Sequence, residues 1–184
     1  MSRVTTVNRF VKGLYVAAGV AMVAGTVSYA AGARIIRMED QCDPATFNAV
    51  FGDGTCVSSH RGVTFEHFIN ELTHTEHAGG WMFSPRQVNI TEGQQFQALN
   101  NGGEVHTFTE VDEFGGGFIP ELNDLSGNPV PAPECIALTQ KPGFPVIDEL
   151  IPAGGKSEAE DEEPGTHHYQ CCIHPWMRTN VTVR

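Results

Sequence analysis

The residues best suited to chemistry lie close to the C-terminal end of the chain. Within seven residues stand a thiol, an imidazole and a thioether, as Cys171, His174 and Met177. A second imidazole, His106, begins a segment with the composition of a β-strand. Two imidazoles, one thiolate and a weak axial thioether are the ligand set of a blue-copper electron-transfer site. The sequence therefore predicts a metal site for one copper ion, cycling between Cu(I) and Cu(II), at His106, Cys171, His174 and Met177.

Two cysteines are adjacent, and only one can be the thiolate ligand of this loop. Side chains alternate across a strand, so Tyr169 and Cys171 share one face while Gln170 and Cys172 share the other. Tyr169 is the apolar residue that should face the core. We therefore expect Cys171 to face the metal and Cys172 to point outward.

The loop also resembles the C-x2-H-x2-M ligand loop of the cupredoxins, the group of plastocyanin, azurin and pseudoazurin. The turn Asn100-Asn101-Gly102-Gly103 is similar to the family's upstream half, in which a histidine opens a strand after an Asn/Gly-rich turn. The resemblance covers about residues 81–184. It implies the following roles: Cys171 as the thiolate, His174 as the exposed imidazole, Met177 as the axial ligand and His106 as the buried imidazole.

The resemblance extends to one further residue and fails at three features. Thr107 falls where such proteins often place a side chain that hydrogen-bonds to the loop after the cysteine. The adjacent Cys172, the bulky Trp176 and the cysteine-containing segment 34–78 depart from the family pattern.

The chain holds five cysteines, an odd number that leaves one thiol over in an oxidising compartment. With Cys171 set aside as a ligand, the other four allow three pairings. Among these we favour a Cys42–Cys56 and a Cys135–Cys172 disulfide.

The N-terminal segment has the pattern of a secretory signal. Three basic residues precede the apolar run 14–27, and the small residues 28–33 offer cleavage after Ala30 or Ala33. The alternative is an uncleaved membrane anchor, because Leu14 to Ala33 is about long enough to cross a bilayer. In either case the sequence predicts that the working domain is periplasmic or secreted, with residues 1–33 as signal peptide or anchor.

The remaining chain predicts an all-β fold with a short helical, cysteine-containing N-terminal extension over residues 34–80. Residues 34–59 carry dense turn signals and are expected to be irregular, whereas apolar residues at 65, 68, 69 and 72 predict a helix. Short strands separated by Gly, Pro and Asn then predict a β-sandwich over 81–184. The family resemblance implies that this sandwich is of the Greek-key cupredoxin type. We expect one of these strands at Cys135–Leu138 and irregular excursions over 112–134 and 152–165.

Charge and composition limit the function. Removing residues 1–33 takes away three basic residues and no acidic ones, which leaves 8 basic and 22 acidic residues. Such a chain binds neither nucleic acid nor an anionic membrane by charge, but it could dock a basic redox protein of the cytochrome kind. A membrane contact is expected only if the N-terminal segment stays uncleaved.

The predicted function is single-electron transfer by a mononuclear type 1 copper site outside the cytoplasm. The alternative is a non-redox copper carrier or buffer, although such proteins tend to use clustered methionines. A structural zinc site would require more cysteines or histidines at closed spacing. Because no second catalytic constellation is present, we predict no enzyme activity.

Overall fold

The structure is a computed structural model that describes residues 32–58, 62–141 and 150–184. The basic and apolar parts of the predicted signal segment, and His60, lie outside the described residues. Among the residues described, no helix is long and apolar enough to span a membrane.

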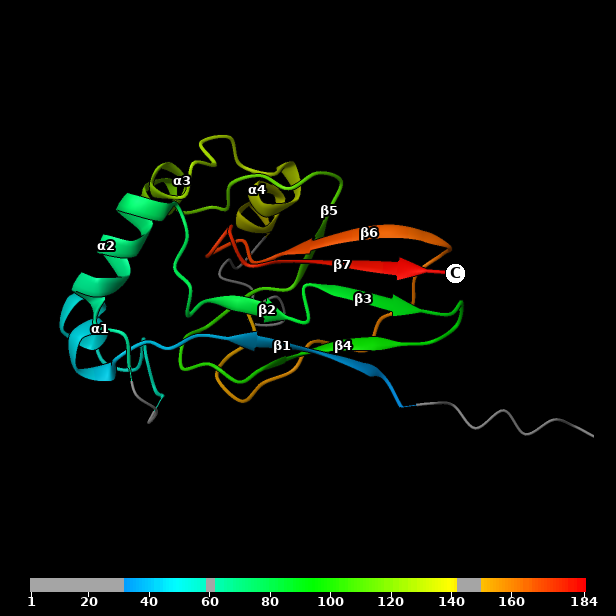
Figure 1. Ribbon diagram of the computed structural model, residues 1–184, viewed down its shortest axis with the longest axis horizontal. Coiled ribbons are helices and arrows are strands. Elements are labelled where there is room, and N and C mark those ends of the chain that lie inside the picture. Colours follow the sequence, from blue (N-terminus) through cyan, green and yellow to red (C-terminus); the bar gives the residue numbers. More distant parts are fainter. Residues whose placement is uncertain (1–31, 59–61, 142–149) are drawn as a thin grey trace, which may run out of the picture.

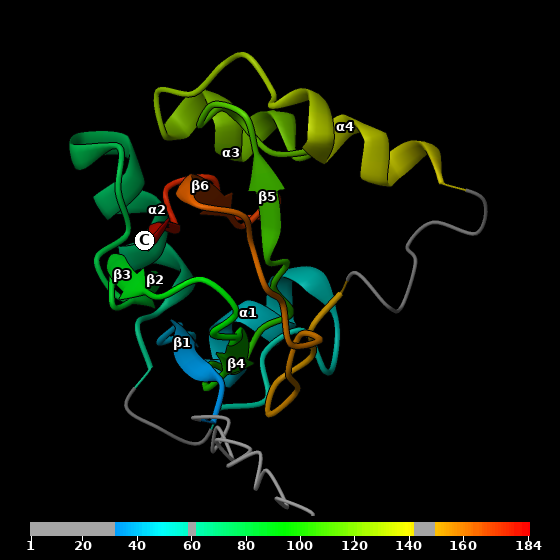
Figure 2. The same cartoon turned by 90° about the vertical axis from the view of Figure 1, so that its right-hand side faces the viewer.

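Two β-sheets stack face to face and form the body of the molecule (Figures 1 and 2). In the part of the chain that the structure describes, one sheet has three strands in the order β2-β1-β4 and the other has four in the order β3-β7-β6-β5. The strands are β1 (Arg34–Glu39), β2 (Met82–Ser84), β3 (Gln87–Ile90), β4 (Phe96–Asn100), β5 (Thr109–Val111), β6 (Gly165–Gln170) and β7 (Arg178–Val183). The predicted β-sandwich is confirmed.

The first strand shows that the expectation of irregular structure over residues 34–59 was wrong. In β1 the buried Ile36 and Met38 alternate with the exposed Arg37, and β1 is the central strand of its sheet, parallel to β4 and antiparallel to β2. This alternation is the pattern of a strand with one buried face. The extension therefore contributes a strand to the sandwich.

Four short helices accompany the sheets in the described residues: α1 (Pro44–Phe51), α2 (Phe65–Thr75), α3 (Pro120–Leu125) and α4 (Pro133–Gln140). The predicted helix is confirmed as α2, which begins at the N-cap Thr64 and buries Phe68 and Leu72. Helix α1 starts where the Asp43 side chain accepts the N–H of Thr46. Helices α1, α2 and α3 gather at the end of the sandwich where β6 and β7 are joined (Figure 1).

The expected strand at Cys135–Leu138 was wrong, since these residues lie in α4. Proline is favoured in the first helical turn, where its missing N–H is not needed, and Pro133 begins α4 as Pro120 begins α3. The excursion over 112–134 is therefore partly helical.

The buried residues form two clusters, and each of the two adjacent cysteines belongs to a different one. Tyr169 and Cys171 belong to the main core between the sheets, whereas Cys172 packs in a smaller cluster with Cys135 and Leu138. The alternation argued from the sequence is thus confirmed, with Cys171 facing inward and Cys172 facing α4.

Candidate metal centre

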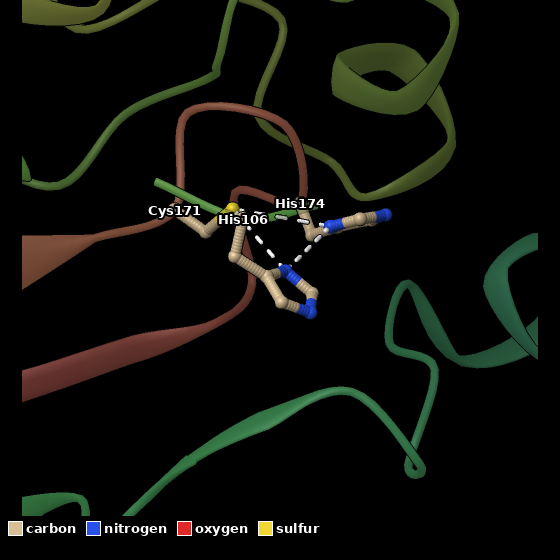
Figure 3. Close-up of side chains that lie close together, drawn as sticks. All are labelled: His106, Cys171 and His174. Carbon is tan, nitrogen blue, oxygen red and sulfur yellow. Dashed lines mark hydrogen bonds between the residues drawn. The ribbon is translucent and has the colours of Figure 1, made fainter. Parts of the chain in front are cut away.

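Three of the four predicted ligands meet at one point in the structure (Figure 3). The Sγ atom of Cys171 lies 3.7 Å from Nδ1 of His106 and 3.9 Å from Nδ1 of His174, and the two Nδ1 atoms are 3.3 Å apart. All three residues are buried. One sulfur and two ring nitrogens therefore face a common point from which water is largely excluded.

The loop between β6 and β7 carries two of these side chains in a fixed shape. Cys171 follows the last residue of β6, and its N–H donates to the carbonyl of Met177 at 3.0 Å. The N–H of Met177 in turn donates to the carbonyl of His174 at 2.9 Å. These bonds close the loop tightly between two paired strands.

His106 reaches the loop from a separate segment. Its backbone pairs with Ile151 through two hydrogen bonds, of 3.1 Å and 2.8 Å. The next residue, Thr107, donates its backbone N–H to the Cys171 sulfur at 3.4 Å. Its hydroxyl accepts the N–H of Cys172 at 2.7 Å, which is the contact that the family resemblance implied for Thr107.

Two buried carboxylates lie behind the imidazoles, and the sequence analysis missed both. Nε2 of His106 lies 2.9 Å from Oδ2 of Asp40, and Nε2 of His174 lies 3.7 Å from Oε2 of Glu104. Oε2 of Glu104 also accepts the indole N–H of Trp81 at 2.6 Å. The sequence could indicate these carboxylates only by their residue type, because each lies far in sequence from the histidine that it contacts, with no fixed spacing between the two.

The proton affinities of the side chains at the site reflect their interactions with one another. Burial alone would raise the pKa of the Cys171 thiol, but hydrogen bonds with His106 and His174 lower it well below its usual value. Burial would lower the pKa of His106, yet its bonds to Asp40 and Cys171 raise it to about 10. Burial raises the pKa of Glu104, although His174 and Trp81 act in the opposite direction. The cysteine is thus favoured as the thiolate, the form that binds metals.

The expectation that His174 is the exposed imidazole was wrong. His174 is 3% exposed, because helices cover this end of the sandwich. It lines a cavity of about 470 Å³ whose other walls are mainly apolar side chains of α1, α2 and α3. Trp176, 8% exposed, packs beside its ring at a centroid distance of 5.4 Å.

Met177 is fully buried in the main core, directly before β7. Its backbone closes the ligand loop as described above. The axial role of its thioether stays a prediction.

Both predicted disulfides are present. Cys42 is bonded to Cys56 and Cys135 to Cys172, and Cys171 is the free cysteine. The second disulfide joins the residue after Cys171 to α4, so it attaches the helical excursion to the ligand loop.

Comparison with known proteins identifies structural neighbours only. No family model matches the chain, and no curated protein is significantly similar. Among solved structures, a purple cupredoxin from Nitrosopumilus maritimus is 16% identical with a TM-score of 0.42, over 82% of this chain and 99% of that one.

Two mutant structures of amicyanin are also similar. A Cu(I) form, 14% identical with a TM-score of 0.35, matches over 56% of this chain and 73% of its own. An oxidised form, 11% identical with a TM-score of 0.37, matches over 86% and 88%. These neighbours are cupredoxins, as the ligand loop suggested. Their TM-scores lie below 0.5, so the function proposed below is supported by the residues of the site itself.

Proposed function

We propose that this protein is a mononuclear type 1 copper protein that transfers single electrons between redox partners outside the cytoplasm. One copper ion would be held by the sulfur of Cys171 and by Nδ1 of His106 and His174, with the thioether of Met177 as a weak axial ligand. The observation that carries the proposal is the convergence of one sulfur and two Nδ1 atoms, 3.3 to 3.9 Å from one another, in a buried site.

The donor set supports copper over other metals. Thiolate and thioether ligands favour Cu(I), and imidazoles also suit Cu(II), so one set of residues can serve both oxidation states. A closed zinc site commonly uses four Cys or His ligands. Within the described residues, the group of possible Cys, His and carboxylate ligands at this point is limited to His106, Cys171 and His174.

The contacts around the ligands also support a metal site whose geometry changes little between oxidation states. The three ligand atoms lie 3.3 to 3.9 Å from one another, and each imidazole has a buried carboxylate behind it. The N–H of Thr107 directed at the Cys171 sulfur stabilises negative charge there. A ligand arrangement held in place by the protein has little reorganisation to undergo when the charge of the site changes.

The surroundings support an extracytoplasmic carrier that docks a protein partner. Disulfides persist mainly in oxidising compartments, and this chain has two. With a formal net charge of −11, it is suited to a basic redox partner. His174 is the metal-site residue nearest to a hollow in the surface, since it lines the apolar cavity between the helices.

The test is a copper titration of the purified protein followed by voltammetry. We expect one copper per chain, a coloured Cu(II) form and a reversible one-electron wave. A colourless protein that keeps only Cu(I) would favour the carrier, and a protein that takes up zinc but no copper would overturn the proposal.

A further inference from the structure

The carboxylate of Asp40 lies against a metal-site imidazole from a distant part of the chain. Asp40 follows β1, 66 residues before His106, and its Oδ2 lies 2.9 Å from Nε2 of His106. Both side chains are 0% exposed. Water therefore cannot replace either partner, and the contact is part of the construction of the site.

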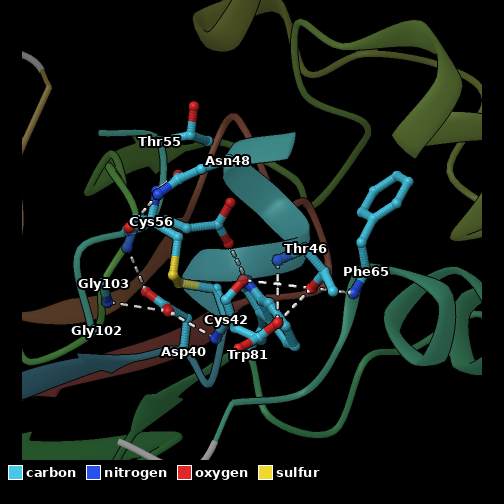
Figure 4. The surroundings of a disulfide bond; sticks show 12 residues. Asp40, Cys42, Thr46, Asn48, Thr55, Cys56, Phe65, Trp81, Gly102 and Gly103 are labelled. Carbon is cyan, nitrogen blue, oxygen red and sulfur yellow. Dashed lines mark hydrogen bonds between the residues drawn. A yellow bond between two sulfur atoms is a disulfide. The ribbon is translucent and has the colours of Figure 1, made fainter. Parts of the chain in front are cut away.

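Asp40 is itself held by backbone groups on both oxygens. Oδ1 accepts the N–H groups of Cys42 at 3.2 Å and Gly103 at 3.0 Å, and Oδ2 accepts the N–H of Glu104 at 3.0 Å. Figure 4 shows the carboxylate between the Gly102-Gly103 turn and the Cys42–Cys56 disulfide. These bonds fix both the position and the rotation of the carboxylate.

The turn has no room for larger residues. A β-carbon at Gly102 would overlap the carboxylate of Asp40, and one at Gly103 would meet Ser58 and the sulfur of Cys42. The Asn/Gly-rich turn before His106 is therefore shaped to let the carboxylate approach the imidazole.

A carboxylate in this position determines which ring nitrogen of His106 can bind metal. An ionised carboxylate only accepts hydrogen bonds, so Nε2 must carry the proton. In the neutral ring, Nδ1 then holds the free electron pair, and Nδ1 is the atom that faces Cys171 and His174. A hydrogen bond of this kind also makes the imidazole a stronger donor to a metal.

We propose that Asp40 is a positioning residue of the copper site: it holds His106 in the tautomer and orientation that bind through Nδ1. This inference rests on the proposed function. It also makes the segment before residue 81 part of the metal centre, since the residue that orients a ligand lies between β1 and the Cys42–Cys56 loop.

The test compares Asp40→Asn with Asp43→Asn. In Asp40→Asn the amide can donate to Nε2, which favours the tautomer with its proton on Nδ1, the metal-binding atom. Asp43 lies in the same segment and caps α1 through Thr46. Its variant therefore changes an aspartate that caps a helix, without involving His106.

We expect Asp40→Asn to weaken Cu(I) binding, measured against a competing chelator, by about 10- to 100-fold. The reduction potential of the copper that still binds should rise, because a weaker imidazole donor stabilises Cu(II) less. Asp43→Asn should leave both quantities unchanged. Equal affinities and potentials in Asp40→Asn and the wild type would overturn the inference while leaving the proposed function intact.

A measurement on the wild type covers the case in which Asp40→Asn does not fold. Nitrogen NMR of the Cu(I) protein should show a slowly exchanging proton on Nε2 of His106 and no proton on Nδ1. A proton on Nδ1 would contradict the role of Asp40. A wild-type protein that binds no copper would overturn the proposed function and this inference with it.

Discussion

Thr107 forms hydrogen bonds with both of the adjacent cysteines, Cys171 and Cys172. Its hydroxyl accepts the N–H of Cys172 at 2.7 Å, and its own N–H donates to the sulfur of Cys171 at 3.4 Å. All three residues are buried. A single residue beside His106 thus links the two halves of the metal site, which lie more than sixty residues apart in the sequence.

The first prediction concerns the Thr107 hydroxyl. Thr107→Val keeps the shape of the side chain but leaves the buried N–H of Cys172 without its acceptor. We expect the free energy of unfolding of the metal-free protein to fall by about 1–3 kcal/mol, measured by chemical denaturation. Copper should still bind, because the ligands are unchanged. The half-buried Thr109 donates its own hydroxyl to that of Thr107 at 3.1 Å, and Thr109→Val should cost less because it leaves the N–H of Cys172 paired. Equal stabilities of Thr107→Val and the wild type would contradict this account.

The disulfide between Cys135 and Cys172 should contribute to stability and leave the ligand set intact. Cys135→Ser and Cys172→Ser should each lower the free energy of unfolding by about 2–5 kcal/mol. The double variant should be little worse than either single one, since the second substitution removes no further bond. Additive losses in thermal or chemical unfolding would show that the two sulfurs act separately.

The sequence predicted much of the site because its signals were local. The spacing of Cys171 and His174 and the alternation from Tyr169 onward identified the thiolate, and the structure places His106 beside both. The burial of His174 could not be predicted in this way. It results from α1, α2 and α3 covering one end of the sandwich, and such packing between distant segments leaves no pattern in the local sequence.

The role of the N-terminal extension was missed for two reasons. The turn signals around Pro44 and Gly52 led to a prediction of irregular structure, whereas the segment contains the strand β1 and the helix α1. The alternation of Ile36 and Met38 with polar residues was the available signal for the strand. Asp40 carries no recognisable motif. Its role depends on the tertiary structure, because the pairing of β1 with β4 brings its carboxylate to His106.

The axial position should tune the metal more than hold it. An axial thioether bond is long and weak, so Met177→Leu should keep the copper and its colour. Loss of the thioether should raise the reduction potential, because the remaining ligands stabilise Cu(II) less. Potentiometry that finds an unchanged potential, or a protein that loses all its copper, would count against Met177 as the axial ligand.

Asp40 should make the stability of the metal-free protein depend on pH in acid. Burial alone would raise its pKa, but His106 and the N–H groups of Glu104 and Gly103 lower it from 3.8 to about 2. A lowered pKa in the folded state stabilises the protein above pH 3.8, and this contribution is lost as the pH falls toward 2. The loss should amount to about 2 kcal/mol.

Denaturation at several pH values checks this prediction. The wild type should lose about 2 kcal/mol of its unfolding free energy relative to Asp40→Asn as the pH falls from 4 to 2. Two curves that stay parallel over this range would show that Asp40 does not titrate as described.

The most direct test of the central claim is a Cu(II) titration of Cys171→Ser and Cys172→Ser beside the wild type, followed by visible absorption. The thiolate is responsible for intense colour in such a site, and a hydroxyl cannot replace it. The wild type and Cys172→Ser should develop an intense band that saturates at one copper per chain, whereas Cys171→Ser should develop none and bind copper weakly. An intense band in Cys171→Ser, or its absence from the wild type, would contradict a copper centre built on the Cys171 thiolate.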